Sequence, residues 1–186
     1  MDTTLEKVYQ FADDAHADQL RKYCPDRYMV HPRRVMELCK PIATDITMLA
    51  AALLHDVLED TPVTKAELSI FLTDLTNIQT ANKILKLVVE LTDIYIKATY
   101  PQLNRKERKT REAKRMQSVS PEAQTLKYAD ILDNCREIVL YDRQFAPRFL
   151  QECRQLLQVM DKGDDHLRNQ ALKVVEDGLK SIRHSP

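Results

Sequence analysis

Apolar residues recur at helical spacing along most of the chain, and no segment keeps the alternating pattern of a half-buried strand. The run from Met48 to Leu54 is apolar on nearly all sides, which is typical of a helix in the centre of a helical domain. One amphipathic stripe consists of Ile84, Leu85, Leu87, Val88 and Leu91. The pattern therefore predicts an all-α fold, a single compact helical bundle.

Helix start signals agree with this pattern. They are Asp45, the capping box from Thr64 to Glu67, and Ser120 followed by Pro121. The helix that begins after Ser120 should run through Asp130 to about Leu140. Two more helices fit residues 146–160 and 165–182.

The chain has the size of one domain. Its 186 residues can bury a core, and no internal repeat or linker interrupts them. The least regular segment runs from Lys97 to Val119 and contains Pro101 and a dense run of charges. We expect one domain over residues 1–186, with a motif-bearing core at about 8–160 and a C-terminal helix at about 165–182.

Composition narrows the classes of ligand. Charged residues make up 30% of the sequence but cancel to a formal net charge of zero, so nothing attracts the whole chain to nucleic acid or to an anionic membrane. No stretch approaches the ~20 apolar residues that span a bilayer. We therefore expect a small-molecule partner, no nucleic acid and no membrane, and the sequence leaves the oligomeric state open.

The start of the chain and the cysteines predict a cytoplasmic protein. Met1 is followed by an aspartate and two threonines rather than by the basic and apolar regions of a secretory signal. The cysteines are scattered and form no C-x-x-C pair; they are Cys24, Cys39, Cys135 and Cys153. We expect them to be reduced and mostly packed.

His55 and Asp56 end the most apolar helical run, where ionisable groups need a compensating partner. A divalent metal is one such partner, and the ordinary alternative is a core histidine bonded to a nearby acid. Helical spacing places His55 above Glu59 and Asp56 above Asp60, so four functional groups line one corner of the helix.

Compatible groups occur at two other places. His31 precedes Pro32 at a predicted helix start, and Asp130 and Asn134 form an i, i+4 pair on a helix whose other residues look packed. Two histidines and two carboxylates on three helices could leave coordination positions open for water and substrate, as in a catalytic metal site. Such a ligand mixture suits Mn²⁺, Fe²⁺ or Zn²⁺.

The order His31, His55-Asp56, Asp130 resembles the HD phosphohydrolase superfamily, whose metal ligands are these four in that order. A finer resemblance is to the hydrolase domain of RelA/SpoT proteins, above all to small stand-alone alarmone hydrolases of the metazoan SpoT-homologue type. It covers about residues 8–160, and the segments that carry it are 19–22, 28–32, 51–61 and 126–134. The block His-Asp-x-x-Glu-Asp-Thr is far more specific than a bare His-Asp pair.

The resemblance implies an activity and a role for each matched residue. Enzymes of this type use Mn²⁺ and remove the 3′-pyrophosphate from guanosine alarmones, which gives GDP or GTP. Glu59 and Asp60 would position or deprotonate the attacking water, whose pKa the metal lowers. Arg21, Lys22 and Asn134 would contact the nucleotide.

The sequence departs from this family pattern in its basic segment, which has seven cationic residues between Arg105 and Arg115. It predicts either a solvated helix face with i, i+4 pairs such as Glu107 with Arg111, or a phosphate-binding flap in which Arg105 and Arg108 contact the substrate. The late-helix tyrosine that touches the nucleotide in this family has no clear match, and Phe149 is the nearest candidate.

Two other functions are compatible with the sequence. One is an HD phosphohydrolase for another nucleotide, such as an adenosine alarmone, a nucleoside monophosphate or a nucleotide cofactor. The other is a non-catalytic nucleotide-binding or immunity module. The intact ligand set favours an enzyme, because a scaffold does not need it.

Overall fold

The structure is a computed structural model that describes residues 3–22 and 25–183, and within these ranges it contains ten helices. The one strand-like feature of the described residues is an isolated antiparallel bridge between Leu20 and Arg27. The all-α prediction is therefore confirmed. The chain divides into two compact units, residues 1–92 and 93–186, and the predicted extent of one domain over residues 1–186 stays a prediction.

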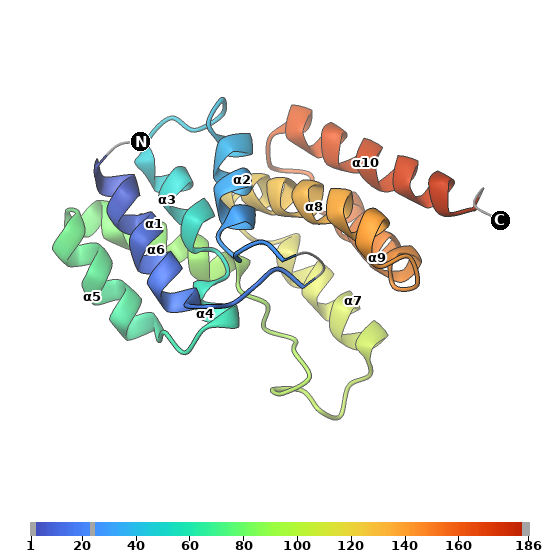
Figure 1. Cartoon of the computed structure of the whole chain (residues 1–186), viewed down its shortest axis with the longest axis horizontal. Helices are drawn as coiled ribbons and strands as arrows, with labels where there is room; N and C mark the ends of the chain where they lie inside the picture. The colour runs from blue at the N-terminus through green and yellow to red at the C-terminus, as the bar shows by residue number, and fades with distance from the viewer. Residues whose placement is uncertain (1–2, 23–24, 184–186) are drawn as a thin grey trace. The chain divides into compact units, whose positions relative to one another are not determined.

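The first unit is built around its most apolar helix (Figure 1). Its helices are α1 (Thr3–His16), α2 (Val30–Cys39), α3 (Ile46–Leu54), α4 (Val57–Asp60), α5 (Lys65–Leu75) and α6 (Ile78–Leu91). Helix α3 packs against α1, α2 and α6, and α5 packs on α6. The side chains from Ala50 to Leu54 are completely buried, as the apolar run predicts. The residues that directly follow α3 therefore start from the buried interior of the unit.

Local sequence signals set the helix boundaries of the first unit. The Asp45 side chain accepts a hydrogen bond of 2.8 Å from the backbone N–H of Thr47, and Thr64 and Glu67 form the predicted capping box. Helix α2 ends at Cys39, shortly before Pro41, which cannot donate a backbone hydrogen bond.

The second unit contains four helices: α7 (Arg105–Met116), α8 (Pro121–Tyr141), α9 (Ala146–Val159) and α10 (Asp165–Arg183). Helix α10 packs along α8 and α9 (Figure 1). Gly163 lies in the turn before α10, where an added Cβ would come within 2.5 Å of the Tyr128 ring and 2.8 Å of the Thr125 backbone nitrogen. Only glycine allows this close approach of the turn to α8.

Helix α7 lies in the segment that looked least regular, and it agrees with the interpretation of the basic residues as a helix face. Asn104 caps the helix, and Glu107 completes a capping box by accepting a hydrogen bond of 2.8 Å from the Asn104 backbone. The predicted pair of Glu107 with Arg111 is therefore wrong, because Glu107 serves the cap. Glu112 is buried and accepts hydrogen bonds from the backbone N–H groups of Ile94 and Tyr95. Helix α7 thus buries a carboxylate where an amphipathic helix usually buries an apolar side chain.

Three of the four cysteines, Cys39, Cys135 and Cys153, are buried and form no disulfide, whereas Cys24 lies outside the described residues.

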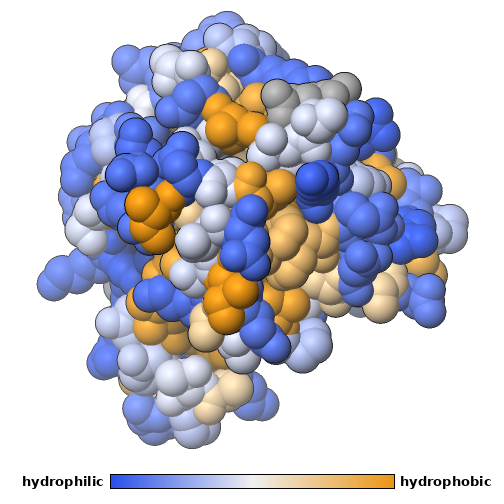
Figure 2. All heavy atoms as spheres, turned by 90° about the vertical axis from the view of Figure 1, so that its left-hand side faces the viewer, coloured by the Kyte–Doolittle hydropathy of each residue, from blue (hydrophilic) through white to orange (hydrophobic). Residues whose placement is uncertain are grey.

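Figure 2 shows one face of the molecule, on which hydrophobic groups are interrupted by hydrophilic ones. The exposed apolar side chains of the first unit include Ile70 and Ile78. None of the described helices is both long enough and apolar enough to cross a membrane.

Candidate metal centre

Three potential metal ligands meet where α3 ends. His55 and Asp56 follow the last residue of α3 and keep right-handed helical backbone angles, and His31 is the second residue of α2. One ligand atom from each of the three residues lies within 4.8 Å of the other two. The structure thus brings together three of the four predicted metal ligands.

The three side chains converge on one carboxylate oxygen. Asp56 Oδ2 lies 3.1 Å from His55 Nε2 and 3.7 Å from His31 Nε2. The two imidazole rings meet edge to face, with their centroids 5.2 Å apart. Both histidines are buried, whereas Asp56 is partly exposed. The cluster therefore has a buried histidine side and a carboxylate side that solvent reaches.

The backbone fixes the tautomer of His55. Its Nδ1 lies 2.8 Å from the carbonyl oxygen of Ala52, which can only accept a hydrogen bond. Nδ1 therefore carries a proton, and Nε2, which faces Asp56, is the nitrogen that is placed to bind a metal. An imidazole that donates through one nitrogen and presents the other is the usual arrangement of a metal-ligating histidine.

Tyr28 was not assigned a role by the sequence analysis, yet its hydroxyl lies at the carboxylate side of the cluster. Its oxygen lies 2.7 Å from Asp56 Oδ2 and 2.6 Å from Asp60 Oδ2, so its one proton is shared between the two carboxylates. Burial raises the pKa of the Tyr28 phenol far above its ordinary value, and the charges of Asp56 and Asp60 raise it further, so it stays a donor. No periodic signal in the sequence marks this role, because Tyr28 lies in the loop before α2.

The ring of Tyr28 is held from two sides. His16 stacks on it, with ring centroids 4.2 Å apart, and the guanidinium carbon of Arg21 lies 5.7 Å from its centroid. His16 is itself buried, and its Nδ1 lies 2.8 Å from Gln19 Oε1, so His16 packs beside Tyr28.

The predicted nucleotide contacts Arg21 and Lys22 lie on the loop between α1 and α2. Backbone hydrogen bonds of 2.9 Å from Arg21 to Asp26 and of 3.0 Å from Tyr28 to Gln19 hold the two arms of the loop together. Arg21 is partly exposed and Lys22 is exposed. Tyr28 thus contacts both the loop that carries the predicted substrate cations and the carboxylates of the cluster.

Glu59 and Asp60 both lie on α4 with exposed side chains. A backbone hydrogen bond of 2.8 Å from Asp60 to Asp56 continues the helical turn across the junction of α3 and α4. Asp60 is therefore one turn beyond Asp56, as predicted, and shares the hydroxyl of Tyr28 with it.

The fourth predicted ligand, Asp130, belongs to α8 in the second unit. Lys127 Nζ lies 2.8 Å from its Oδ2, and the amide of Asn134 donates to its Oδ1 at 2.5 Å. Asp130 and Asn134 are thus neighbours on α8, as the i, i+4 spacing predicts. Their participation in the metal site of the first unit stays a prediction.

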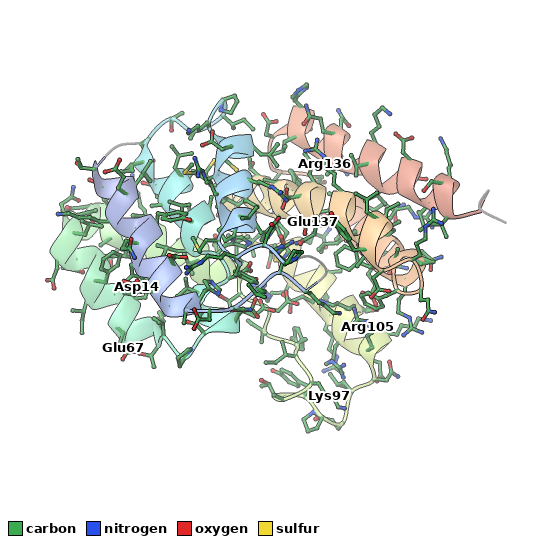
Figure 3. The ribbon with its side chains drawn as sticks, in the orientation of Figure 1. Asp14, Glu67, Lys97, Arg105, Arg136 and Glu137 are labelled. Carbon is green, nitrogen blue, oxygen red and sulfur yellow. The ribbon has the colours of Figure 1, made fainter. Side chains whose placement is uncertain are left out.

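The basic segment forms a helix with ion pairs. Arg105, labelled in Figure 3 at the start of α7, donates from Nε and a terminal nitrogen to Glu152, both at 2.8 Å. Arg108 donates to the carbonyl oxygen of Leu103. These bonds favour the interpretation as a helix face over the phosphate flap, and contacts of Arg105 and Arg108 with substrate stay predictions.

The donor set of the cluster fits a divalent transition metal. Two imidazole nitrogens and one carboxylate oxygen are the ligands that Mn²⁺, Fe²⁺ and Zn²⁺ share in proteins, and three protein ligands are fewer than these ions take up. The fixed tautomer of His55 supports the same conclusion, because it places Nε2 at the point of convergence.

Comparisons with known proteins agree with this chemistry. The HD domain family matches residues 28–135, a range that includes all four predicted ligands. The mouse (Mus musculus) guanosine-3′,5′-bis(diphosphate) 3′-pyrophosphohydrolase MESH1 is 35% identical over 137 residues, which cover 72% of this chain and 69% of the mouse protein.

Longer bacterial proteins match over a shorter segment. A probable GTP pyrophosphokinase of Mycobacterium leprae is 43% identical over 65 residues, which are 35% of this chain and only 8% of that protein. The match thus spans less than a tenth of this relative.

One solved structure shares the fold over nearly the whole chain. It is that of a metazoan ortholog of SpoT that hydrolyses ppGpp, with a TM-score of 0.80 over 96% of this chain and 98% of the other. Its sequence is 23% identical, so the likeness establishes the helical fold and not the activity.

Proposed function

Since this chain belongs to the HD-domain family, we propose that it is a metal-dependent hydrolase that removes the 3′-pyrophosphate from guanosine alarmones, releasing GDP or GTP and pyrophosphate. The observation that carries the proposal is the convergence of His31, His55 and Asp56 within 4.8 Å in a chain related to MESH1. A diffusible nucleotide substrate also fits the cytoplasmic location that the sequence predicts.

In this proposal His31, His55 and Asp56 hold one divalent ion and Asp130 completes the ligand set. Mn²⁺ is the ion we propose, by the resemblance to alarmone hydrolases, and Fe²⁺ and Zn²⁺ suit the same donors. A divalent ion in this position supplies Lewis-acid polarisation of a phosphoryl oxygen and lowers the pKa of water.

The carboxylates of α4 have the roles of proton acceptor and water-orienting group. Glu59 and Asp60 are exposed and lie within one helical turn of the ligand pair. Asp60 Oδ2 already accepts a hydrogen bond of 2.6 Å from the Tyr28 hydroxyl, which fixes the orientation of its carboxylate. Glu59 is therefore the preferred general base, and Asp60, held by Tyr28, orients the water.

The cations of the loop between α1 and α2 bind the substrate in this proposal. Arg21 and Lys22 would bind the phosphates of the nucleotide, and Asn134 would contact the substrate from α8. Arg105 and Arg108 would have to leave Glu152 and the Leu103 carbonyl before they could bind phosphate.

Replacing Tyr28 by phenylalanine should weaken Mn²⁺ binding and lower kcat. The ring would still pack between His16 and Arg21, but Asp56 and Asp60 would lose their shared donor. Loss of a group that orients metal ligands typically costs about 10–100-fold in metal affinity or activity. Calorimetric titration with Mn²⁺ measures the effect, and Tyr141→Phe, which alters an exposed phenol, is the control.

A double-mutant cycle shows whether Tyr28 acts through Asp60. Tyr28→Phe and Asp60→Asn both disturb the same hydrogen bond. The loss of Mn²⁺ affinity in the double variant should therefore be smaller than the sum of the losses in the two single variants. Fully additive losses would mean that Tyr28 does not orient this carboxylate.

Replacing Arg21 by alanine should raise KM for the nucleotide by about tenfold or more, because a charge-assisted contact with phosphate is lost. The value of kcat should change little, since Arg21 is neither a proposed metal ligand nor one of the carboxylates proposed to act on the water. The KM of Arg21→Lys should lie between those of the wild type and Arg21→Ala, because lysine keeps the charge but not the planar fork. Steady-state kinetics decides, and a fall in kcat at unchanged KM would contradict a binding role.

A nucleotide panel tests the proposed function. The purified chain is incubated in Mn²⁺ or in EDTA with guanosine alarmones, adenosine alarmones, nucleoside monophosphates and nucleotide cofactors. We expect Mn²⁺-dependent turnover of guanosine alarmones with the highest kcat/KM. Faster turnover of another nucleotide would assign a different HD hydrolase activity, and binding without turnover would favour the non-catalytic module.

A further inference from the structure

A hollow lies within the second unit, between α7 and α9. It encloses about 510 Å³, which is within the size range of small-molecule sites. Its charged lining consists of Arg105, Lys106 and Lys109 from α7 and Arg148 and Glu152 from α9. The rest of the lining is one asparagine and two glutamines, so the hollow suits a polar anion rather than an apolar ligand.

Two of the four cations are fixed to carboxylates and shape the walls. Arg105 is bonded through two nitrogens to Glu152 and lies over the ring of Phe145, with its guanidinium carbon 5.1 Å from the ring centroid. Lys109 Nζ lies 2.9 Å from Asp93. Glu152, the single carboxylate of the lining, is therefore already neutralised by Arg105.

The other two cations, Lys106 and Arg148, are exposed and make no ion pair with any described residue. They come from different helices, so they face the hollow from opposite walls. The amides of Gln151 and Gln155 line the same hollow and can donate or accept hydrogen bonds. The hollow thus combines two available positive charges with neutral polar groups.

We propose that this hollow between α7 and α9 binds the phosphate groups of a small phosphorylated molecule. Lys106 and Arg148 contact the phosphates, and the bonded pair of Arg105 and Glu152 forms the rigid wall beside them. Arginine suits this role because its planar fork binds two phosphate oxygens at once. Gln151 and Gln155 can form hydrogen bonds with hydroxyl or base groups of the same ligand. Because every lining residue comes from the second unit, binding requires neither the histidines of the metal centre nor a metal ion.

The test is calorimetric titration of the full chain with inorganic pyrophosphate in EDTA at low ionic strength. We expect saturable binding that weakens as salt is added, because the exposed charges become screened. The double variant Lys106→Glu, Arg148→Glu should bind about tenfold more weakly or worse. The matched control is Lys7→Glu, Lys83→Glu, which reverses two exposed cations of the first unit. Circular dichroism verifies that both variants are folded.

Two further arms separate the possible outcomes. GDP should compete with pyrophosphate and guanosine should not, if phosphate is the recognised group. Equal affinity of the two double variants, or no binding of pyrophosphate in EDTA, overturns the proposal. Since the titration contains no metal, binding in this hollow by a chain that hydrolyses no alarmone would support the inference while the proposed function fails.

Discussion

Replacing Asp130 by alanine should abolish Mn²⁺ binding and alarmone hydrolysis while most of the helix content remains. Asp130 is buried on α8, and its carboxylate is the fourth metal ligand that we propose. A site built around a cation binds it far less well when one ligand is missing. Metal content per chain, steady-state turnover and circular dichroism measure the three parts of this expectation.

The control for this variant is Asp133→Ala. Asp133 is also a buried carboxylate of α8, but it lies outside the register of the predicted ligand. It should keep metal binding even if the chain becomes less stable. If Asp130→Ala keeps wild-type turnover in added Mn²⁺, then α8 does not contribute to the metal site.

Replacing Glu59 by glutamine should lower kcat by about 10²–10⁴, the usual contribution of a positioned general base, with little change in KM. Glutamine keeps the size and the hydrogen bonding of the side chain but removes the basic oxygen. Because Glu59 is exposed and is not one of the proposed ligands, the variant should still bind Mn²⁺. Steady-state kinetics at saturating Mn²⁺ gives both constants.

Two comparisons make this result decisive. Asp74→Asn removes an exposed carboxylate from α5 of the same unit and should leave kcat unchanged. Asp60→Asn should lower kcat less than Glu59→Gln if Asp60 only orients the water. If Glu59→Gln raises KM alone, Glu59 is a binding residue and Asp60 becomes the better candidate for the base.

The metal cluster could be predicted because its signals are local. An apolar run that ends in His55-Asp56 requires a compensated buried charge, and helical spacing then places Asp60 one turn beyond Asp56. The resemblance to HD hydrolases added His31, which lies on a different helix. The structure brings these residues of the first unit together as expected.

The role of Tyr28 could not be predicted, because it depends on how the loop between α1 and α2 folds back. A tyrosine in a loop gives no periodic signal, and its contacts with Asp56 and Asp60 span about thirty residues of sequence. They arise from hydrogen bonds between the arms of the loop and from the stacking of His16, which no local pattern encodes.

The bounds of helix α7 could not be predicted, for a different reason. Its buried positions include Glu112 and Met116, so it lacks the apolar stripe by which the other helices were recognised. The capping box from Asn104 to Glu107 was the available signal for its start. Its arginines were for the same reason considered for a phosphate flap, whereas Arg105 pairs with Glu152.

The most direct test of the proposed activity is phosphorus NMR of ppGpp incubated with the Mn²⁺-loaded chain. We expect the resonances of GDP and of inorganic pyrophosphate to appear together in a 1:1 ratio, because hydrolysis at the 3′ position releases the intact pyrophosphate. EDTA and the Asp130→Ala variant should prevent both products. Orthophosphate as the first product, or ppGpp that stays intact at saturating Mn²⁺, would contradict a 3′-pyrophosphohydrolase.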